Sequence, residues 1–294
     1  MNAEAVNTAR TTRRNPEAIK RRFKLGVQTF FAVIFTLIMI FPIFWLVSTA
    51  LKTEEEAMSA QLVFWPAVPQ FQNFAYAMTK VPMLRYFLNT VIVTAMQMLS
   101  ELGLGIMAAY AFSKGRFYGK HFLFILVLGA MMIPLQVTFV PLYVIIARMG
   151  LMSTYWGIWI ASCVSSYSIF LLRQSFMSVD NSYLEAAQVD GMNKLGIIFR
   201  IMVPMCKPTV ITVALTAFMS GWNNYFWPKI IVKDELMYVL TIGVQRPKST
   251  FGHETINNYH QIMAGLLLSI LPVFVVFALF QKHMLSGFTK AAMK

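Results

Sequence analysis

Charged residues are scarce in this sequence. Only 13% of the 294 residues are Asp, Glu, Lys or Arg, and 57% are hydrophobic. An ordinary soluble domain carries roughly 25% charged residues. The low charge content therefore argues against a soluble protein and indicates that lipid surrounds most of the chain.

Cysteine is scarce too, and its placement excludes the sites that cysteine usually builds. Cys163 and Cys206 form no CxxC pattern, and the four histidines lack ligand spacing. The sequence also has no HExxH, no G-x-S-x-G and no pair of carboxylates in one apolar stretch. We therefore expect neither a disulfide framework nor a metal site, and we predict no catalytic residue.

A phosphate-binding loop is absent as well. Gly191 and Gly196 have the four-residue gap of such a loop, but Ile197 and Ile198 follow them. A phosphate loop needs Lys and Ser or Thr at those two positions to hold phosphates and magnesium. The sequence thus predicts no bound cofactor and no ATP site of this kind.

Long apolar runs dominate what is present. A bilayer core about 30 Å thick requires about 20 mostly apolar residues per helix. The runs of that length are Val27–Leu51, Leu88–Phe112, Phe122–Ala147, Tyr155–Phe176, Thr209–Val232 and Ile262–Leu285. They predict an all-α integral membrane protein of about six transmembrane helices. The expected organisation is a basic segment over 1–26, a membrane domain over 27–285 and a tail over 286–294.

The first run is expected to remain as a membrane anchor. The leader before it is too long and too charged for a signal peptide, and no small-residue cleavage site follows. Prolines within several runs do not oppose a membrane span, because neighbouring helices or waters can satisfy the freed backbone carbonyls.

Lys and Arg fall mostly on one side of the expected membrane. With the N-terminus inside, the leader, the even-numbered connections and the C-terminal end hold 17 of the 25 Lys and Arg residues. The positive-inside rule therefore places both termini in the cytoplasm. It also accounts for most of the net charge of +13 without a nucleic-acid partner.

Two external segments look different from simple turns. Residues 52–86 carry an acidic run and several aromatic side chains, which favour an ordered cap or interfacial helix over a plain connector. The connection 228–261 is long and polar, and connections of that size are usually functional or disordered.

Glu101 stands out within the second apolar run. A carboxylate inside the membrane is costly and is a candidate for a polar path or a proton relay. This residue is the main support for an alternative function, a proton-coupled secondary carrier. Such carriers usually show repeat symmetry between their halves, and none is visible here. The structural interpretation is an interhelical hydrogen bond or a position near the interface.

The cytoplasmic connection between the fourth and fifth runs is polar yet has a helical pattern. Ser182 and Glu185 have the spacing of a capping box, which predicts a helix start at Ser182. The short helix would present the small side chains of Ala186 and Ala187 and turn sharply at Gly191. A second helical piece would continue to Pro204.

This connection resembles the EAA motif of inner-membrane permeases of binding-protein-dependent ABC importers. The resemblance rests on EAAQVDG, a nine-residue gap and then Ile-Met-Val-Pro, where the family usually has Leu in place of Val203. Further stretches, among them FPIFWLVSTALKTEEEA and RYFLNTVIVT, are similar to the carbohydrate-uptake branch along nearly the whole chain.

The resemblance implies a type I-like importer fold and a set of partners. These are a second homologous permease, two ATP-binding subunits that hold ATP and magnesium, an external solute-binding protein and a carbohydrate substrate. The Ser182–Pro204 loop would act as a coupling helix that docks on the ATPase. The residues so implied are Glu185, Ala186, Ala187, Asp190, Gly191 and Pro204.

The end of the fifth run resembles a second family pattern. Its residues are Trp222, Asn223, Asn224 and Tyr225, with Asn224 where Asp is common in the family. Aromatic rings stack on the apolar faces of sugars and amides satisfy their hydroxyls, so these residues, with Glu101, are candidates for the substrate path. The other interpretation is an aromatic belt at the membrane interface.

Overall fold

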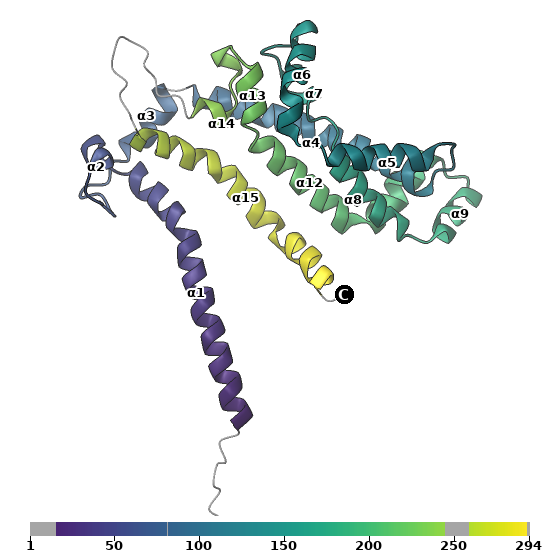
Figure 1. The fold of residues 1–294 in the computed structure, drawn as a ribbon, viewed down its shortest axis with the longest axis horizontal. Helices are drawn as coiled ribbons and strands as arrows, with labels where there is room; N and C mark the ends of the chain where they lie inside the picture. Colours follow the sequence, from purple (N-terminus) through teal and green to yellow (C-terminus); the bar gives the residue numbers. More distant parts are fainter. Residues whose placement is uncertain (1–15, 81, 245–258, 293–294) are drawn as a thin grey trace, which may run out of the picture.

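The computed structural model describes residues 16–80, 82–244 and 259–292. The described part of the chain is helical throughout, with no strand (Figure 1). Its longer helices are α1 (Pro16–Ala50), α3 (Gln72–Lys80), α4 (Met83–Lys114), α5 (Lys120–Met131), α6 (Leu135–Arg148), α8 (Ser166–Met177), α9 (Asn181–Val189), α12 (Lys207–Trp222) and α15 (Tyr259–Ala292). Short helices among them are α2 (Glu54–Met58), α7 (Tyr155–Ile160), α13 (Phe226–Ile231) and α14 (Leu240–Gly243). The prediction of an all-α protein is confirmed.

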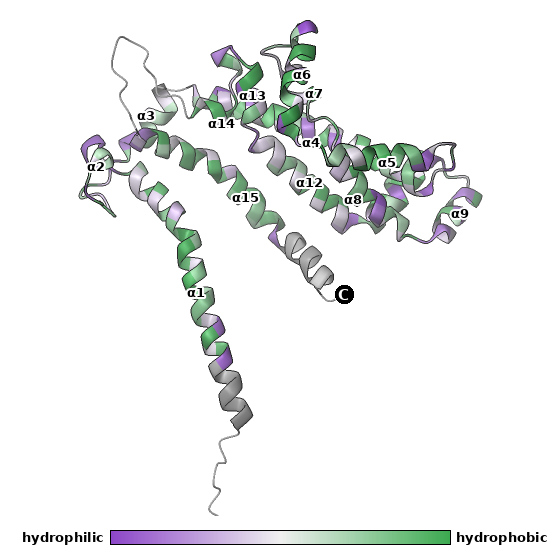
Figure 2. Cartoon of the chain, in the orientation of Figure 1, coloured by the Kyte–Doolittle hydropathy of each residue, from purple (hydrophilic) through white to green (hydrophobic). Residues whose placement is uncertain are grey.

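Three helices are continuous and apolar enough to cross a membrane. They lie in α1, α4 and α15, and correspond to the first, second and sixth predicted runs. Figure 2 shows α1 covered with hydrophobic residues along most of its length. Between Leu25 and Phe44 its apolar side chains are exposed in the isolated chain, so they face lipid or another subunit rather than this chain's own core.

The remaining predicted runs are bent or broken. The third run is divided at Pro134, where α5 and α6 meet at 102°. The fifth belongs to a second bent pair, Lys194–Met205 with Lys207–Ile231, which meets at 91°. The fourth is split into α7 and α8 by residues 161–165. By length and composition, the described residues contain three spans, or five if each bent pair counts as one.

Side-chain caps begin both helices of the fourth run. Thr154 begins α7 by accepting a hydrogen bond from Gly157 N at 3.1 Å, and Ser165 begins α8 by accepting one from Ser168 N at 3.3 Å. A helix end leaves several backbone N–H groups without intrahelical partners, and lipid offers none. The Ser165 cap therefore allows the chain to break where a membrane run would otherwise have to be continuous, and Thr154 caps the start of the same run.

The segment after α1 forms an ordered cap. Thr53 and Glu56 form a capping box at the start of α2, and Glu56 Oε1 also accepts from Ala67 N at 3.0 Å. These hydrogen bonds, the one from Ala67 first, hold the pKa of the Glu56 carboxyl below its usual value. Asn73 adds side-chain hydrogen bonds to the carbonyls of Ala50 and Lys52, both at 2.9 Å. The prediction of an ordered cap is confirmed, and the plain-connector interpretation is wrong.

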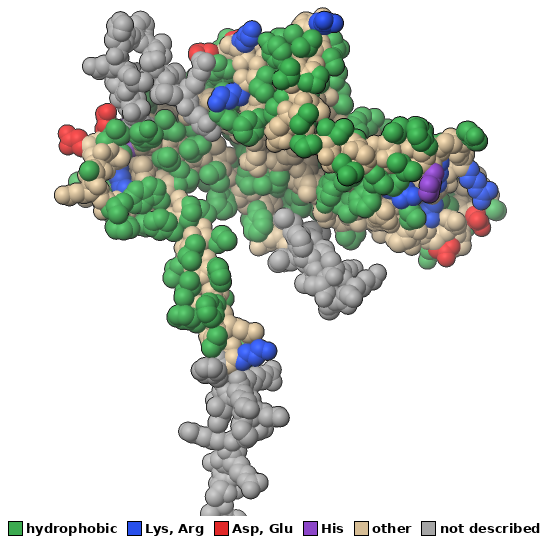
Figure 3. Space-filling model, viewed as in Figure 1, with side chains coloured by type: hydrophobic (Ala, Val, Ile, Leu, Met, Phe, Trp, Pro, Cys, Tyr) green, Lys and Arg blue, Asp and Glu red, His purple; other side chains and the backbone are tan. Residues whose placement is uncertain are grey.

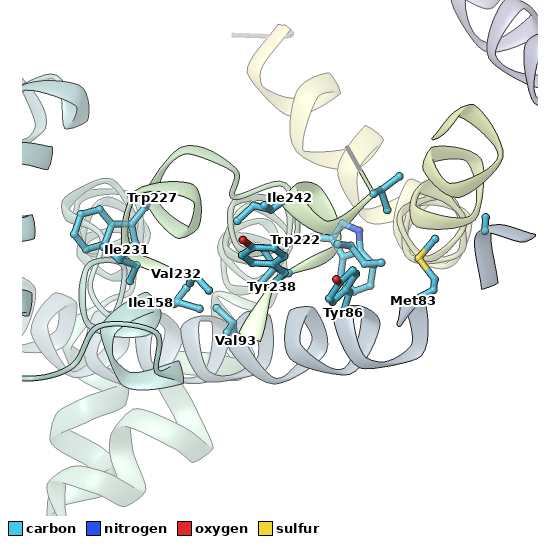
Figure 4. Close-up of a cluster of buried hydrophobic side chains, with 14 of the residues drawn as sticks. Met83, Tyr86, Val93, Ile158, Trp222, Trp227, Ile231, Val232, Tyr238 and Ile242 are labelled. Carbon is cyan, nitrogen blue, oxygen red and sulfur yellow. The ribbon is translucent and has the colours of Figure 1, made fainter. Parts of the chain in front are cut away.

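A hydrophobic core joins the N-terminal half of α4 to α7, α12, α13 and α14. Figure 4 shows part of it, with Tyr86, Trp222 and Tyr238 close together. Gly243 allows the closest approach, because a Cβ atom there would lie 2.1 Å from Cδ2 of Tyr86. Gly243 therefore lets α14 pack closely on α4, and Trp222 packs on the same helix through Phe87, with ring centroids 5.8 Å apart.

Candidate functional site

The loop between α8 and α12 contains a short helix that starts earlier than predicted. α9 begins at Asn181, and Asp180 is its N-cap, accepting a hydrogen bond from Ser182 N at 2.9 Å. This bond is the main reason that the pKa of the Asp180 carboxyl lies below its usual value. The capping box predicted at Ser182 and Glu185 is therefore wrong. Asp is at least as good an N-cap as Ser, and with Asp180 in that role Ser182 falls inside the helix.

Gly191 ends α9 in the way its position in the sequence predicts. Its φ is +77°, in the left-handed region that glycine adopts without strain. Gly191 N donates to Gln188 O at 3.0 Å, and Met192 N donates to Ala187 O at 2.9 Å. These two bonds form a Schellman motif, which satisfies the last carbonyls of the helix.

The second helical piece is also present. Asn193 caps it by accepting from Gly196 N at 2.7 Å, and the chain then passes through a π-helical segment, Ile197–Met202, before α11 (Val203–Met205). Pro204 has no N–H and cannot donate to the carbonyl four residues before it, which interrupts regular α-helical bonding in this stretch. π-Helical turns occur frequently at functional sites.

The inner side of α9 rests on a hydrophobic cluster that reaches several helices. Leu184 and Ala187 are each 5% exposed and belong to a cluster with Ile106 of α4, Phe176 of α8 and Val213 of α12. The expectation that Ala187 faces outward is therefore wrong: it fills the inner face. The loop thus connects to α4, α8 and α12 through this cluster, with the π-helical segment Ile197–Met202 in contact with both α9 and α4.

Lys114, the last residue of α4, ties that helix to the start of the loop. Its Nζ donates to Val179 O at 2.5 Å and to Asn181 Oδ1 at 2.8 Å. Together with the hydrophobic cluster, these bonds mean that a displacement of α9 would act on α4 as well as on α8 and α12.

The outer side of α9 combines acidic, small and apolar side chains. Glu185, Ala186 and Asp190 are exposed there, as the sequence predicts. Tyr183 and Val189 are also exposed, at 55% and 88%, and the sequence reasoning missed them. Their spacing from Ala186 and Glu185 along a helix would have placed them on this outer face. An acidic helix with exposed apolar side chains is suited to docking on a partner with a cation and an apolar pocket.

Glu101 lies deep between two helices rather than on a surface. Its side chain is 5% exposed and accepts a hydrogen bond from the hydroxyl of Ser168, which is fully buried in α8. One residue before it, Ser100 accepts a hydrogen bond from Trp159 Nε1 at 2.9 Å. The geometry therefore matches the interhelical hydrogen bond that the sequence offers as the structural interpretation.

Two substitutions of Glu101 distinguish an interhelical hydrogen bond from a proton relay. Glu101→Gln keeps an acceptor for Ser168, so we expect a loss of stability of at most about 1 kcal/mol and nearly unchanged transport. Glu101→Leu leaves the Ser168 hydroxyl buried without a partner, which typically costs about 1–3 kcal/mol. Thermal unfolding in detergent and uptake in vesicles would measure both. If Gln were as inactive as Leu while the protein stayed folded, a proton-carrying role would be indicated.

The four candidate substrate-path residues at the end of α12 and just after it lie in different environments. Trp222 is 5% exposed, stacks on Phe218 with ring centroids 5.6 Å apart, and donates from Nε1 to Ser269 O at 3.2 Å. Its ring is therefore used in packing and is not part of an interfacial belt. Asn223 is exposed, and Asn224 and Tyr225 are half-buried, so only these three can reach a solute.

Comparison with known proteins gives a consistent result. The family model described as "Binding-protein-dependent transport system inner membrane component" matches residues 101–290. The arabinooligosaccharides transport system permease protein AraQ of Bacillus subtilis (strain 168) is 30% identical over 275 residues, which are 92% of this chain and 96% of AraQ.

A second transport permease and a solved transporter structure are also similar to this chain. The sn-glycerol-3-phosphate transport system permease protein UgpE of Yersinia pestis is 27% identical over 261 residues, or 87% of this chain and 92% of UgpE. A bacterial ABC transporter involved in the import of the acidic polysaccharide alginate has a chain of similar fold. Its TM-score is 0.78 at 24% identity, and the match covers 90% of this chain and 97% of that one.

Proposed function

The chain belongs to the family of binding-protein-dependent transport system inner membrane components, and we propose that it is a permease subunit of an ATP-driven carbohydrate importer. In this proposal it forms half of the translocation pore and couples to separate ATPase subunits through the Ser182–Pro204 loop. The substrate class is inferred from AraQ, whose name assigns it to arabinooligosaccharides. UgpE is named for a polyol phosphate, so the particular solute must be determined by experiment.

The observation that supports the coupling role best is the placement of α9. Its outer face presents Glu185, Ala186 and Asp190, and its inner face contacts the π-helical segment Ile197–Met202 and belongs to the hydrophobic cluster that includes residues of α4, α8 and α12. A partner bound on the outer face can therefore move three helices together. ATP and magnesium would be held by that partner, and this chain would carry out no hydrolysis of its own.

The remaining partners follow from the same proposal. A second homologous permease would complete the pore and cover part of the exposed apolar surface of α1. A solute-binding protein would deliver the carbohydrate from outside, where part of the connection 228–261 would contact it. Residues 245–258 of that connection lie outside the described residues. Asn223, Asn224 and Tyr225 remain candidates for contact with the solute.

Co-purification and uptake test the proposal together. The full chain, expressed with its partner permease and ATPase, should yield a complex that takes up sugar only with both ATP and the binding protein. A proton-coupled carrier would instead be stopped by an uncoupler and would need no ATPase. Uptake that persists without any ATPase subunit would contradict the proposed function.

The proposed orientation places both termini on the cytoplasmic side of a bacterial inner membrane. After replacement of Cys163 and Cys206 by serine, a membrane-impermeant thiol reagent should label Ser59→Cys on the external cap. It should not label Ser178→Cys next to α9. Both serines are exposed in the isolated chain, which makes them a matched pair. Labelling of Ser178→Cys alone would reverse the orientation and remove the coupling argument.

A further inference from the structure

Three basic side chains meet at the C-terminal end of α4. Arg173 of α8 donates from Nε to Phe112 O at 3.0 Å, and Lys120 of α5 donates from Nζ to Ser113 O at 3.0 Å and to Gly115 O at 2.9 Å. Lys114 approaches from the other side through its bonds to the start of α9. The helix C-terminus, with a charge of roughly −0.5, offsets only part of this positive charge.

The charge at this point is poorly compensated. The charged groups that act most on Lys120 are Arg173 and Lys114, and both are cations that repel it. Asp180 lies within range of Lys114 but serves as the N-cap of α9. In the described part of the chain, Lys120 and Arg173 make no ion pair with a carboxylate. An anion from outside the chain would relieve the repulsion.

Hydrogen-bond donors remain available for such an anion. Lys120 uses two of the three N–H groups of an ammonium, and Arg173 uses only Nε of the guanidinium, whose terminal nitrogens carry four more. The Arg173 guanidinium is also held in place, 3.9 Å above the ring of Phe124. A fixed guanidinium beside an ammonium suits the oxygens of a phosphate group.

The surroundings indicate that this phosphate belongs to a lipid. Next to the cations, the outer face of α5 exposes apolar side chains: Phe122 (64%), Leu123 (44%), Ile125 (57%) and Leu126 (54%). The preceding turn exposes Phe117 and Tyr118, and tyrosine is one of the side chains enriched at headgroup level. Figure 3 shows basic side chains beside a histidine at the end of the molecule that carries α5 and α9, bordered by apolar side chains.

We propose that Lys120 and Arg173 bind the phosphate of an anionic phospholipid of the cytoplasmic leaflet, with its acyl chains along the outer face of α5. Basic pockets between membrane helices on the cytoplasmic side suit such headgroups. The proposal rests on the orientation proposed above. Because Lys114 connects this site to α9, the bound lipid lies directly beside the coupling loop.

Native mass spectrometry of the assembled transporter with added phosphatidylglycerol tests the site. The pair Lys120→Gln and Arg173→Gln should weaken phosphatidylglycerol binding roughly 30-fold relative to phosphatidylcholine, given the usual contribution of each cation near an anionic headgroup. The matched control is Lys229→Gln with Lys233→Gln, which removes the same charge from exposed residues on the external side and should change binding little. Equal losses in the two pairs would show general charge attraction and overturn the proposal.

Two additional measurements test whether the site requires charge and whether its ligand is a lipid or free phosphate. Lys120→Arg with Arg173→Lys retains both charges and should retain the lipid, whereas failure of this pair to bind in a folded complex would contradict the site. Millimolar inorganic phosphate should not displace the lipid, and full displacement would indicate a site for free phosphate instead. ATP-dependent uptake of the Gln pair is measured separately. Lipid binding retained in the Gln pair would overturn this inference alone, whereas uptake that persists without any ATPase subunit would overturn the proposed function.

Discussion

We expect Gly191→Val to abolish sugar uptake and co-purification of the ATPase subunit. Gly191 has a φ of +77°, which costs a residue with a Cβ atom about 1–2 kcal/mol and is least tolerated by a β-branched side chain. A penalty of about 2 kcal/mol shifts the equilibrium of the turn roughly 30-fold away from the native conformation. Both bonds of the Schellman motif would weaken, and α9 would no longer be held against the second helical piece.

The structure supplies a graded control for this prediction. A Cβ atom at Gly191 would meet no other atom of the described chain within 4 Å, so the substitution acts on this chain through backbone conformation alone. Asn tolerates the left-handed region, and Gly191→Asn should therefore keep most uptake, with Gly191→Ala in between. If Asn failed as completely as Val, close approach of the partner would be the cause. Full uptake and co-purification in Gly191→Val would remove the coupling role of the loop.

The sequence predicts the elements that depend on composition, but it does not predict the bends and breaks that depend on packing. The apolar runs of α1, α4 and α15 are long enough to be predicted as membrane spans from length and composition. The 102° bend at Pro134 is not predictable in the same way, because a membrane proline is compatible with a kink, a break or a straight passage. The break before α8 likewise depends on the hydroxyl cap of Ser165, and the close approach of Gly243 to Tyr86 depends on tertiary packing, neither of which pattern alone reveals.

The same division holds at the candidate site. The turn at Gly191 could be predicted, since its requirement is local. The capping-box spacing favours Ser182 as the N-cap, whereas the N-cap of α9 is Asp180, two residues earlier, because two good caps so close together compete. The motif predicts a surface of two alanines, whereas the burial of Leu184 fixes which side of α9 faces the core, and Ala187 lies on that side.

Because Asp180 and not Ser182 is the N-cap of α9, Glu185 cannot serve as the second residue of a capping box. Ser182 lies within α9, so the Glu185 carboxylate has no capping box to complete. Its side chain is exposed, and among the described residues no hydrogen bond or ion pair engages it. In the proposed coupling role, this exposed carboxylate would pair with a cation on the ATPase subunit.

We therefore expect Glu185→Gln to impair uptake nearly as much as Glu185→Ala. Removing one partner of an interfacial charge pair typically costs about 2–5 kcal/mol, because the other charge is left uncompensated, so the affinity for the ATPase should fall roughly 30-fold or more. Co-purification of the ATPase and ATP-dependent uptake measure the loss. Glu55→Gln, an exposed acid in α2 on the opposite side of the proposed membrane orientation, is the matched control and should be silent. Wild-type co-purification in Glu185→Gln with a loss in Glu185→Ala would show that the length of the side chain, and not its charge, is what the partner requires.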